Sequence, residues 1–573
     1  MATRRQALGL AAGLLLWGGR SARAQPVCPD AAGLDRLGDP LAGALPEAMV
    51  RGGDGDAALL ARCDDLSPDG DALVALALAH LRASLPADCA TPEEAGLRAL
   101  VERAGRTGDL RYGRNDPLAA IHRPYRVTAY CGPQTETVTA LAAWQPLDTP
   151  DLLAAWLAKL DALADATLGA ARGLRADRDA GCLPPMLTGR AALAALDGLL
   201  LAPTADHPLL VRLPQGPARA RAEASLTRRV QPAMALLRDT LAALTRAGRA
   251  EPGLWAQKGG DALHAANIAR AGDTNLAPEA AQSYAREEVA RINGLLTKRL
   301  ALRGYKTGTL AERIAALFAA HPGLVASDDA AGREGLVEAA RTHLDAAHAL
   351  LGRLVPPALA TTPPLEVAPL PALGPGQPGG SFYLPALAGA PARLWLDARS
   401  VYALPIPGVA PIVDRLGLPG RHLLAAGAAG VARPRLVAAA AWPALEQGWA
   451  AYGDRLAAEA GLFARDPWGD VARLADELLR AARLVADVGI HQQRWTRAEA
   501  EQRMIEMTGA PQAAALDRIT AMPGEAAAPV LGLARLLELR ETARHAAGRK
   551  FDAKAFHEHV LQGGPRPMAQ VSA

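Results

Sequence analysis

Apolar residues recur at intervals of three and four along most of this 573-residue chain, which is the pattern of helices that bury one face. Between Ala57 and Arg103 the pattern is broken at Pro68 and Pro86, so we predict a small module of short helices there. Longer helices follow, and the one after Thr149 has a good start signal. We predict these longer helices at about 150–175, 218–249, 278–303, 443–460, 471–488, 497–507 and 528–547.

The segment from Val355 to Pro411 lacks the helical pattern and differs in composition from the rest of the chain. Proline and glycine crowd it, and short extended candidates occur at 365–367, 381–384 and 393–396. No other part of the sequence reads as strand. We therefore predict a mainly α-helical fold with a small β-sheet near residues 365–400.

Composition narrows the class of protein. Half of the residues are hydrophobic, 21% are charged and only 4% are aromatic, which is typical of a globular chain whose core is built by helix packing. The formal net charge is +3, and the basic residues are spread along the chain rather than clustered. This gives no electrostatic case for nucleic acid as a partner.

The first 24 residues have the features of a signal peptide. Arg4 and Arg5 precede an apolar run from Ala7 to Trp17, and a small-x-small pattern ends at Ala24. We predict cleavage after Ala24 and a periplasmic or secreted protein. An arginine pair fits both an ordinary signal and a twin-arginine signal, so the export route stays open. No later run is long and apolar enough to span a bilayer, so we expect no membrane span in the mature form.

Five cysteines all lie in the first third of the chain. In an oxidising compartment one or two disulfides are expected, and the odd number leaves at least one thiol unpaired. No Cys-x-x-Cys spacing occurs, so a cysteine zinc site is not supported. We predict an N-terminal helical region at 25–115 stapled by these bonds. The cysteines are Cys28, Cys63, Cys89, Cys131 and Cys182.

One short element carries a chemical signal. From Gly417 to His422 the sequence is Gly-Leu-Pro-Gly-Arg-His, preceded by Arg415 and Leu416. A Pro-Gly-His-His element preceded by a His-Glu pair would suggest a zinc hydrolase, but here only His422 supplies an imidazole. We expect four other polar residues to lie on the surface, namely Asp454, Glu459, His557 and His559.

Several strings together resemble the bacterial family called domain of unknown function 885 (DUF885), from about residue 120 to the end. Its characterised members look like zincin-type metallopeptidases with a largely helical fold, so the resemblance implies such a domain at 116–573. The clearest string runs from Arg473 to Val485 and continues through Asp487 to His491. The remaining strings are Gln447 to Tyr452, Trp495 to Arg497, Pro523 to Ala526, Lys550 to Asp552, Phe556-His557, Val560-Leu561, Leu276 to Glu279, Glu288 to Ile292 and Gly304-Tyr305.

The departures from the family pattern concern the residues that the resemblance assigns to zinc and its general base. The His-Glu pair becomes Arg415 and Leu416, the first downstream His becomes Arg421, and the Glu of Glu-Gly-Trp becomes Gln447. Only His422 is kept, and a guanidinium repels a cation. Two further family positions have changed, to Gln282 and to Pro529-Val530.

We therefore predict an exported, catalytically degenerate metallopeptidase-like protein that binds a peptide or a periplasmic partner protein, with no cofactor. Arg415 and Arg421 are candidates to hold a carboxylate. The alternatives are an active metal-dependent hydrolase with zinc on His422, Glu446 and His491, and a structural role in a complex. No catalytic residue is assigned. The candidate cleft residues are Arg415, Arg421, His422, Glu446, Gln447, Tyr452 and His491.

Overall fold

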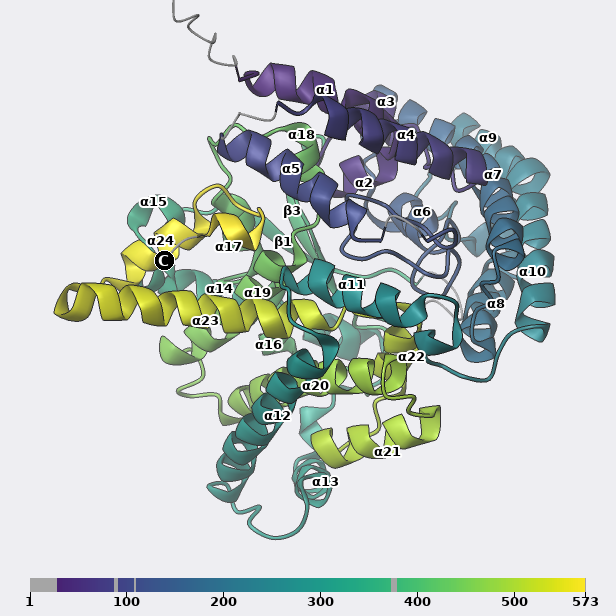
Figure 1. Ribbon diagram of the computed structural model, residues 1–573. Coiled ribbons are helices and arrows are strands. Elements are labelled where there is room, and N and C mark those ends of the chain that lie inside the picture. Colours follow the sequence, from purple (N-terminus) through teal and green to yellow (C-terminus); the bar gives the residue numbers. More distant parts are fainter. Residues whose placement is uncertain (1–27, 87–90, 108–109, 373–378, 572–573) are drawn as a thin grey trace, which may run out of the picture.

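A computed structural model describes residues 28–86, 91–107, 110–372 and 379–571, and this part of the chain is mainly helical with a small sheet (Figure 1). The predicted fold class is confirmed. The predicted signal peptide at 1–24 and Cys89 lie outside the described residues. None of the described helices combines the length and the hydropathy that crossing a membrane requires.

The first five helices pack on a later part of the chain. Their apolar side chains form one core with Leu436, Val437 and Trp442. Cys28 is disulfide-bonded, whereas Cys63, Cys131 and Cys182 are free thiols. The division at residue 115 stays a prediction. These helices are α1 (Ala31–Ala44), α2 (Pro46–Arg51), α3 (Ala57–Leu60), α4 (Pro68–Ser84) and α5 (Pro92–Gly105).

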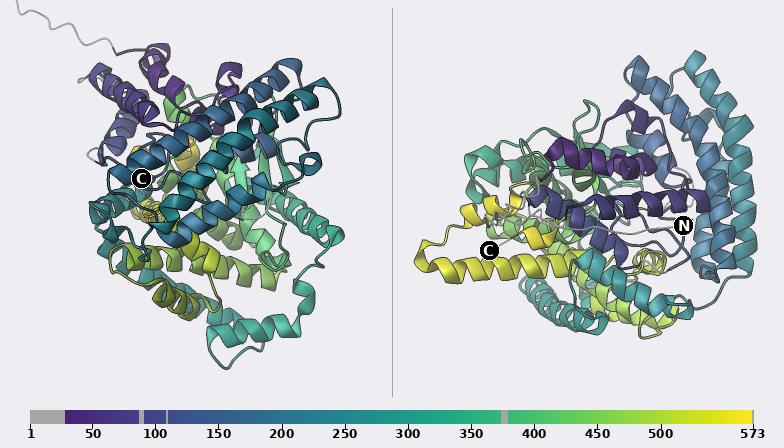
Figure 2. Two further views of the ribbon diagram at one scale, coloured as in Figure 1. Left: turned by 90° about the vertical axis from the view of Figure 1, so that its right-hand side faces the viewer. Right: turned by 45° about the horizontal axis from the view of Figure 1, so that its top comes forward.

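Long helices lie side by side at one end of the molecule (Figures 1 and 2). The hydroxyl of Thr149 caps the first of them, and Pro150 occupies its first turn, where a missing N–H costs nothing. The helix predicted at 218–249 is continuous, with a π-helical stretch at Leu226–Val230 in its middle. The elements here are α6 (Glu136–Thr139), α7 (Pro150–Asp179), α8 (Met186–Leu200), α9 (Pro217–Ser225) and α10 (Gln231–Arg246).

Two helix pairs make extensive contacts, as α19 packs on α23 and α12 packs on α20. The first pair approaches closely at Gly448 and Gly532, because a Cβ on Gly532 would lie 1.9 Å from the carbonyl oxygen of Ala444. These glycines thus fix how α19 crosses α23. The bounds are α11 (Gly260–Gly272), α12 (Pro278–Ala301), α19 (Pro443–Glu459), α20 (Pro467–His491), α21 (Arg497–Thr508), α22 (Ala513–Ala521), α23 (Ala527–Ala547) and α24 (Ala553–Leu561).

The three predicted strands form one sheet in the order β1-β3-β2, in which β1 runs parallel and β2 antiparallel to β3. Val367 and Tyr383 both pair with Leu394 of the central strand. The surrounding helices bury Leu394 and Leu396 in a shared core. The bounds are β1 (Leu365–Pro369), β2 (Phe382–Leu384) and β3 (Ala392–Leu396), with α13 (Leu310–Ala320), α14 (Ala330–Leu354), α15 (Pro357–Ala360), α16 (Val409–Leu416), α17 (Arg421–Ala426) and α18 (Arg435–Ala439) nearby.

Candidate functional site

A cavity of about 460 Å³ lies where α19, α20, the α22–α23 connection and the segment leading into β2 meet. Gln447, one of the predicted cleft residues, lines it from α19, directly before the glycine of the close helix crossing. No other described residue hydrogen-bonds the Gln447 amide. The polar lining comprises Tyr130, Thr135, Thr139, Ser381, Gln447, Arg480, Arg483, Arg518 and Glu525.

Three arginines give the cavity its charge. Arg480 and Arg483 are three residues apart on α20 and so share one face of that helix. Arg518 of α22 makes a bidentate ion pair with Glu525, with both N–O distances 2.7 Å, and its guanidinium lies 5.3 Å from the centre of the Tyr130 ring. Because one carboxylate faces three guanidinium groups here, the lining favours an anion.

Arg483 differs from the other two arginines. No described residue forms a hydrogen bond or ion pair with its guanidinium group, and its Nε is buried without a partner. Burial and repulsion by Arg518 lower the pKa of Arg483 from its ordinary value. A guanidinium presents five donors in a planar fork that matches a carboxylate or a phosphate. Arg483 is thus the group in the cavity best placed to bind an external anion.

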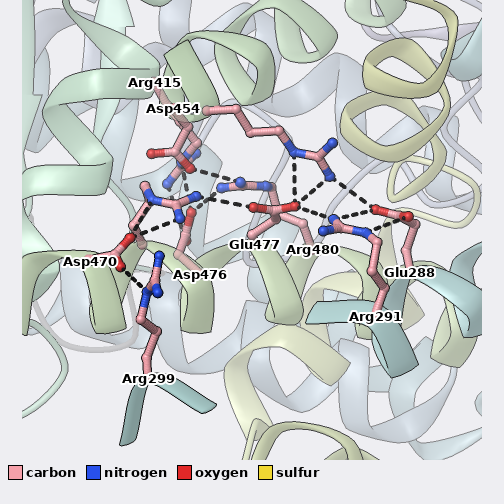
Figure 3. A network of polar contacts seen from close by, with 11 residues as sticks. Glu288, Arg291, Arg299, Arg415, Asp454, Asp470, Asp476, Glu477 and Arg480 are labelled. Atoms are coloured by element: carbon pink, nitrogen blue, oxygen red, sulfur yellow. Dashed lines mark hydrogen bonds and ion pairs between the residues drawn. The ribbon is translucent and has the colours of Figure 1, made fainter. Parts of the chain in front are cut away.

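A network of ion pairs fills the neighbouring space between α12, α16, α19 and α20 (Figure 3). Glu477 is its centre and accepts hydrogen bonds from Arg455, Arg291 and Arg473. The network extends through Asp470 to Arg299, with an N–O distance of 2.8 Å. Its other members are Glu288, Arg415, Asp454, Asp476 and Arg480.

Arg480 joins this network to the cavity. It donates to Asp454 at 2.9 Å and also bonds Asp476. The prediction that Asp454 is a surface carboxylate is wrong, because its side chain is completely buried between α19 and α20. Burial raises the pKa of Asp454 to about 7, although Arg480 opposes that shift. Arg480 therefore holds carboxylates of its own chain and is less available to a ligand.

Arg415 and Arg421 also have carboxylate partners within the chain. Arg415 pairs with Asp476 at 2.9 Å, and Arg421 pairs with Glu446. The second oxygen of Glu446 accepts a hydrogen bond from the backbone of Trp442 at 2.8 Å. Both arginines thus bind a carboxylate, but it is a carboxylate of the protein and not of a ligand.

The three residues considered as zinc ligands have separate partners. The Nε2–H of His422 donates to the carbonyl of Pro363 at 2.8 Å, and its Nδ1 accepts from the Tyr383 hydroxyl. His491 is buried elsewhere, where it accepts from the Leu254 N–H at 2.9 Å and donates to a backbone carbonyl. Within the ranges that the structure covers, no three His, Cys, Asp or Glu side chains gather as metal ligands.

Other predicted residues have structural roles. Tyr452 is buried, and its hydroxyl donates to Nε2 of His557 at 3.0 Å. The prediction that His557 lies on the surface is wrong, because it is also buried and bonds the carbonyl of Leu354. Glu459 and His559 are exposed, as predicted. Gln282 pairs with Gln493 and donates to the carbonyl of Val485.

The sequence alone did not single out Arg480, Arg483, Arg518 or Tyr130 as site residues. A signal was present for the first two, because arginines three apart within a mostly apolar buried helix are unusual. Arg518 and Tyr130 reach the cavity from distant parts of the chain, and no local pattern marks them.

Comparisons with known proteins agree with the fold. A crystal structure from Colwellia psychrerythraea, described as a putative lipoprotein, has a TM-score of 0.84 and 25% sequence identity and covers 94% of this chain and 97% of its own. A similarly described protein of unknown function from Shewanella oneidensis has a TM-score of 0.65 and 15% identity over 95% of this chain and 99% of its own. No curated protein matches the sequence. The profile of the bacterial proteins of unknown function DUF885 matches residues 46–573, and the chain therefore belongs to this family.

Proposed function

We propose that this protein is an exported, non-catalytic binding protein that holds the carboxylate of a peptide in the cavity beside Gln447. The observation that carries the proposal is Arg483, a guanidinium without a carboxylate partner among the described residues, in a cavity of about 460 Å³. Arg483 is partly buried, and withdrawing a cation from water is costly unless it is paired, so a bound carboxylate would give it both a charge partner and a bidentate hydrogen bond.

A peptide is favoured over other acids by the strand beside the cavity. β2 pairs only with β3 among the described strands, so it is an edge strand of the sheet. Ser381 and Phe382, at the start of β2, line the cavity. An extended peptide could add to this edge by main-chain hydrogen bonds while Arg483 takes its C-terminal carboxylate.

Non-catalytic binding is supported by the partners of the former metal-site residues. Arg415 and Arg421 stand where the family resemblance places metal ligands, and each already pairs with a carboxylate. His422 donates through its Nε2–H, and the lone pair of its Nδ1 accepts the Tyr383 hydroxyl, so that lone pair is not directed to an ion. The site thus has the groups for holding a carboxylate rather than for activating water.

Location in the cell envelope is part of the proposal. The predicted signal peptide supports export, and the description of the similar Colwellia psychrerythraea structure as a putative lipoprotein points to the same compartment. A periplasmic partner protein with a free C-terminus would present the same chemistry as a peptide.

Equilibrium dialysis against random pentapeptides tests the proposal. We expect the wild-type protein to retain peptides with a free C-terminal carboxylate at least tenfold better than the same pool carrying C-terminal amides. Arg483→Ala should abolish this preference, whereas Arg286→Ala, at an exposed position on α12, should keep it. Arg483→Lys should retain part of it, because the charge remains and the planar fork is lost. Equal retention of both pools, or a preference unchanged in Arg483→Ala, would overturn the proposal.

A working metallohydrolase remains the alternative. Metal analysis of protein purified without a polyhistidine tag separates the two functions. Stoichiometric zinc that disappears together with peptidase activity in His422→Ala would establish the hydrolase and contradict the binding protein.

A further inference from the structure

A second cavity, of about 310 Å³, lies between α5, α11, the start of α19 and the C-terminal segment 566–569. It shares no lining residue with the cavity beside Gln447. Four arginines line it together with Trp442, namely Arg103 of α5, Arg106 directly after that helix, Arg270 of α11 and Arg566. Arg106 is exposed and donates to the side chain of Asn275. Arg103, Arg270 and Arg566 thus come from distant parts of the chain and meet around a single space.

None of these three guanidinium groups forms an ion pair with a described residue. Arg103 donates to the carbonyl of Pro117, and Arg270 donates to the side-chain oxygen of Asn115, both at 2.9 Å. Arg566 donates to the carbonyl of Val560 at 3.0 Å. Neutral oxygens thus accept several of the guanidinium N–H donors, but a neutral acceptor does not balance a positive charge as an ion-paired carboxylate does.

Two donors remain without a partner. Arg270 is 2% exposed and Arg103 is 8% exposed, and the buried Nε of each makes no hydrogen bond with the part of the chain that the structure describes. An unpartnered buried donor carries the full cost of its desolvation. This cost falls on two of the arginines that line the cavity.

The lining of this cavity contains more arginines than acidic residues, so its charge favours binding of an anion. Burial lowers the pKa of Arg270 to about 9, and the nearby charge of Arg103 adds to that shift. Burial likewise lowers the pKa of Arg566 to about 10. Two acidic residues lie in the lining, Glu102 and Asp273, and both are exposed. One oxygen of Asp273 accepts the backbone N–H of Met568 at 2.7 Å.

We propose that this second cavity is a binding site for a small oxyanion that carries phosphate or carboxylate groups. The anion would compensate the clustered charges of Arg103, Arg270 and Arg566 and supply acceptors that the surrounding carbonyls do not. This site is independent of the proposed peptide site, because Arg483 and Gln447 lie in the other cavity.

Isothermal titration with inorganic phosphate at constant ionic strength, repeated with citrate, tests the proposal on the full chain. Removing an arginine here would also remove carbonyl contacts, so the informative variant adds a charge instead. Ala569 is exposed and lines the cavity, and Ala569→Glu places a carboxylate at its rim. Ala555→Glu, at an exposed position of α24, is the matched control.

We expect a saturable oxyanion-binding step that Ala569→Glu weakens at least tenfold and that Ala555→Glu and Arg483→Ala leave unchanged. Absence of saturable binding of both probes, equal affinity in Ala569→Glu, or loss of binding in Arg483→Ala would overturn the proposal. The last result would move the anion to the cavity beside Gln447 and would leave the peptide proposal standing.

Discussion

Two neighbouring groups of arginines in this molecule differ in what balances their charge. In the network around Glu477, arginines from α12, α16, α19 and α20 each bond one or more carboxylates of the same chain (Figure 3). In the adjoining cavity, Arg483 has no such partner among the described residues. Both groups include residues of α20. Arg480 pairs with carboxylates of the chain, whereas Arg483, one turn further along the same helix, has no such partner among the described residues.

We therefore expect the arginines of the network to stabilise the fold and Arg483 to bind a ligand. Removing one member of a buried ion pair leaves its partner charged and unpaired, so network residues are expected to matter for folding. Arg483 has no partner among the described residues, so its removal should cost the fold little while removing a binding group. Arg415 and Arg421 fall on the paired side of this contrast, because each forms an ion pair with a carboxylate of the same chain.

The largest effect should come from breaking the network beside the cavity. Arg480→Ala leaves Asp454 and Asp476 without this partner and should lower the free energy of unfolding by about 3–5 kcal/mol, as measured by urea denaturation. Asp454 has a folded pKa raised above its unfolded value, so its neutral form is favoured in the fold. The loss in Arg480→Ala should therefore be larger at pH 8 than at pH 5. A loss below about 1 kcal/mol would show that the pairing is dispensable.

The helix crossing that positions Gln447 provides the next test. Gly532→Ala places a Cβ against the backbone of α19 and should destabilise the protein by about 2–3 kcal/mol, as measured by thermal and urea denaturation. Gly294→Ala is the control, because this exposed glycine of α12 has no neighbour within 4 Å of the added Cβ. The control should be neutral or stabilising by up to about 1 kcal/mol. Equal effects of the two changes would contradict the close crossing.

A buried neutral histidine adds a second pH dependence, at lower pH than that of the Arg480–Asp454 pair. Burial, together with repulsion by His264, lowers the pKa of His491 to about 3. Since the unfolded imidazole takes up a proton below about pH 6.5, stability is full above that pH and is lost as the pH falls towards 3. His491 alone should account for about 2 kcal/mol of the loss between pH 7 and pH 5.

Urea denaturation at pH 7 and pH 5 measures this contribution. His491→Gln should reduce the difference between the two pH values, whereas His80→Gln, at an exposed position of α4, should leave it as in the wild type. A pH dependence unchanged in His491→Gln would mean that this imidazole is not held neutral by burial.

The smallest effect on folding should come from the cavity itself. Arg483→Ala should change the free energy of unfolding by less than about 1 kcal/mol, because no described partner loses a contact. The same variant should lose the preference for peptide carboxylates. A large destabilisation would show that Arg483 stabilises the fold as the paired arginines do, so the two groups would not differ.

Much of the fold follows from local pattern. The three short strands between proline- and glycine-rich segments were predicted, and so were the long helices, because period and capping residues act over a few positions. The family match begins at residue 46, well before the strings that suggested it, because the amphipathic helices of the first hundred residues carry few distinctive motifs.

The partners and the burial of the site residues could not be predicted from local sequence patterns. The sequence placed Gln447 in the cleft, but it could not reveal that Arg415 and Arg421 have internal partners, since Asp476 and Glu446 reach them from other helices. Asp454 and His557 looked like surface residues because their burial depends on how α19 packs against α20 and α24. Arg518 and Tyr130 meet only through tertiary packing.

A crystal structure with a bound pentapeptide carrying a free C-terminal carboxylate is the sharpest test of the proposed peptide site. The carboxylate is predicted within hydrogen-bond distance of the Arg483 guanidinium, with the peptide running beside β2 and Gln447. A carboxylate bound instead to Arg415 or Arg421, or a zinc ion on His422 with the peptide across it, would contradict the account.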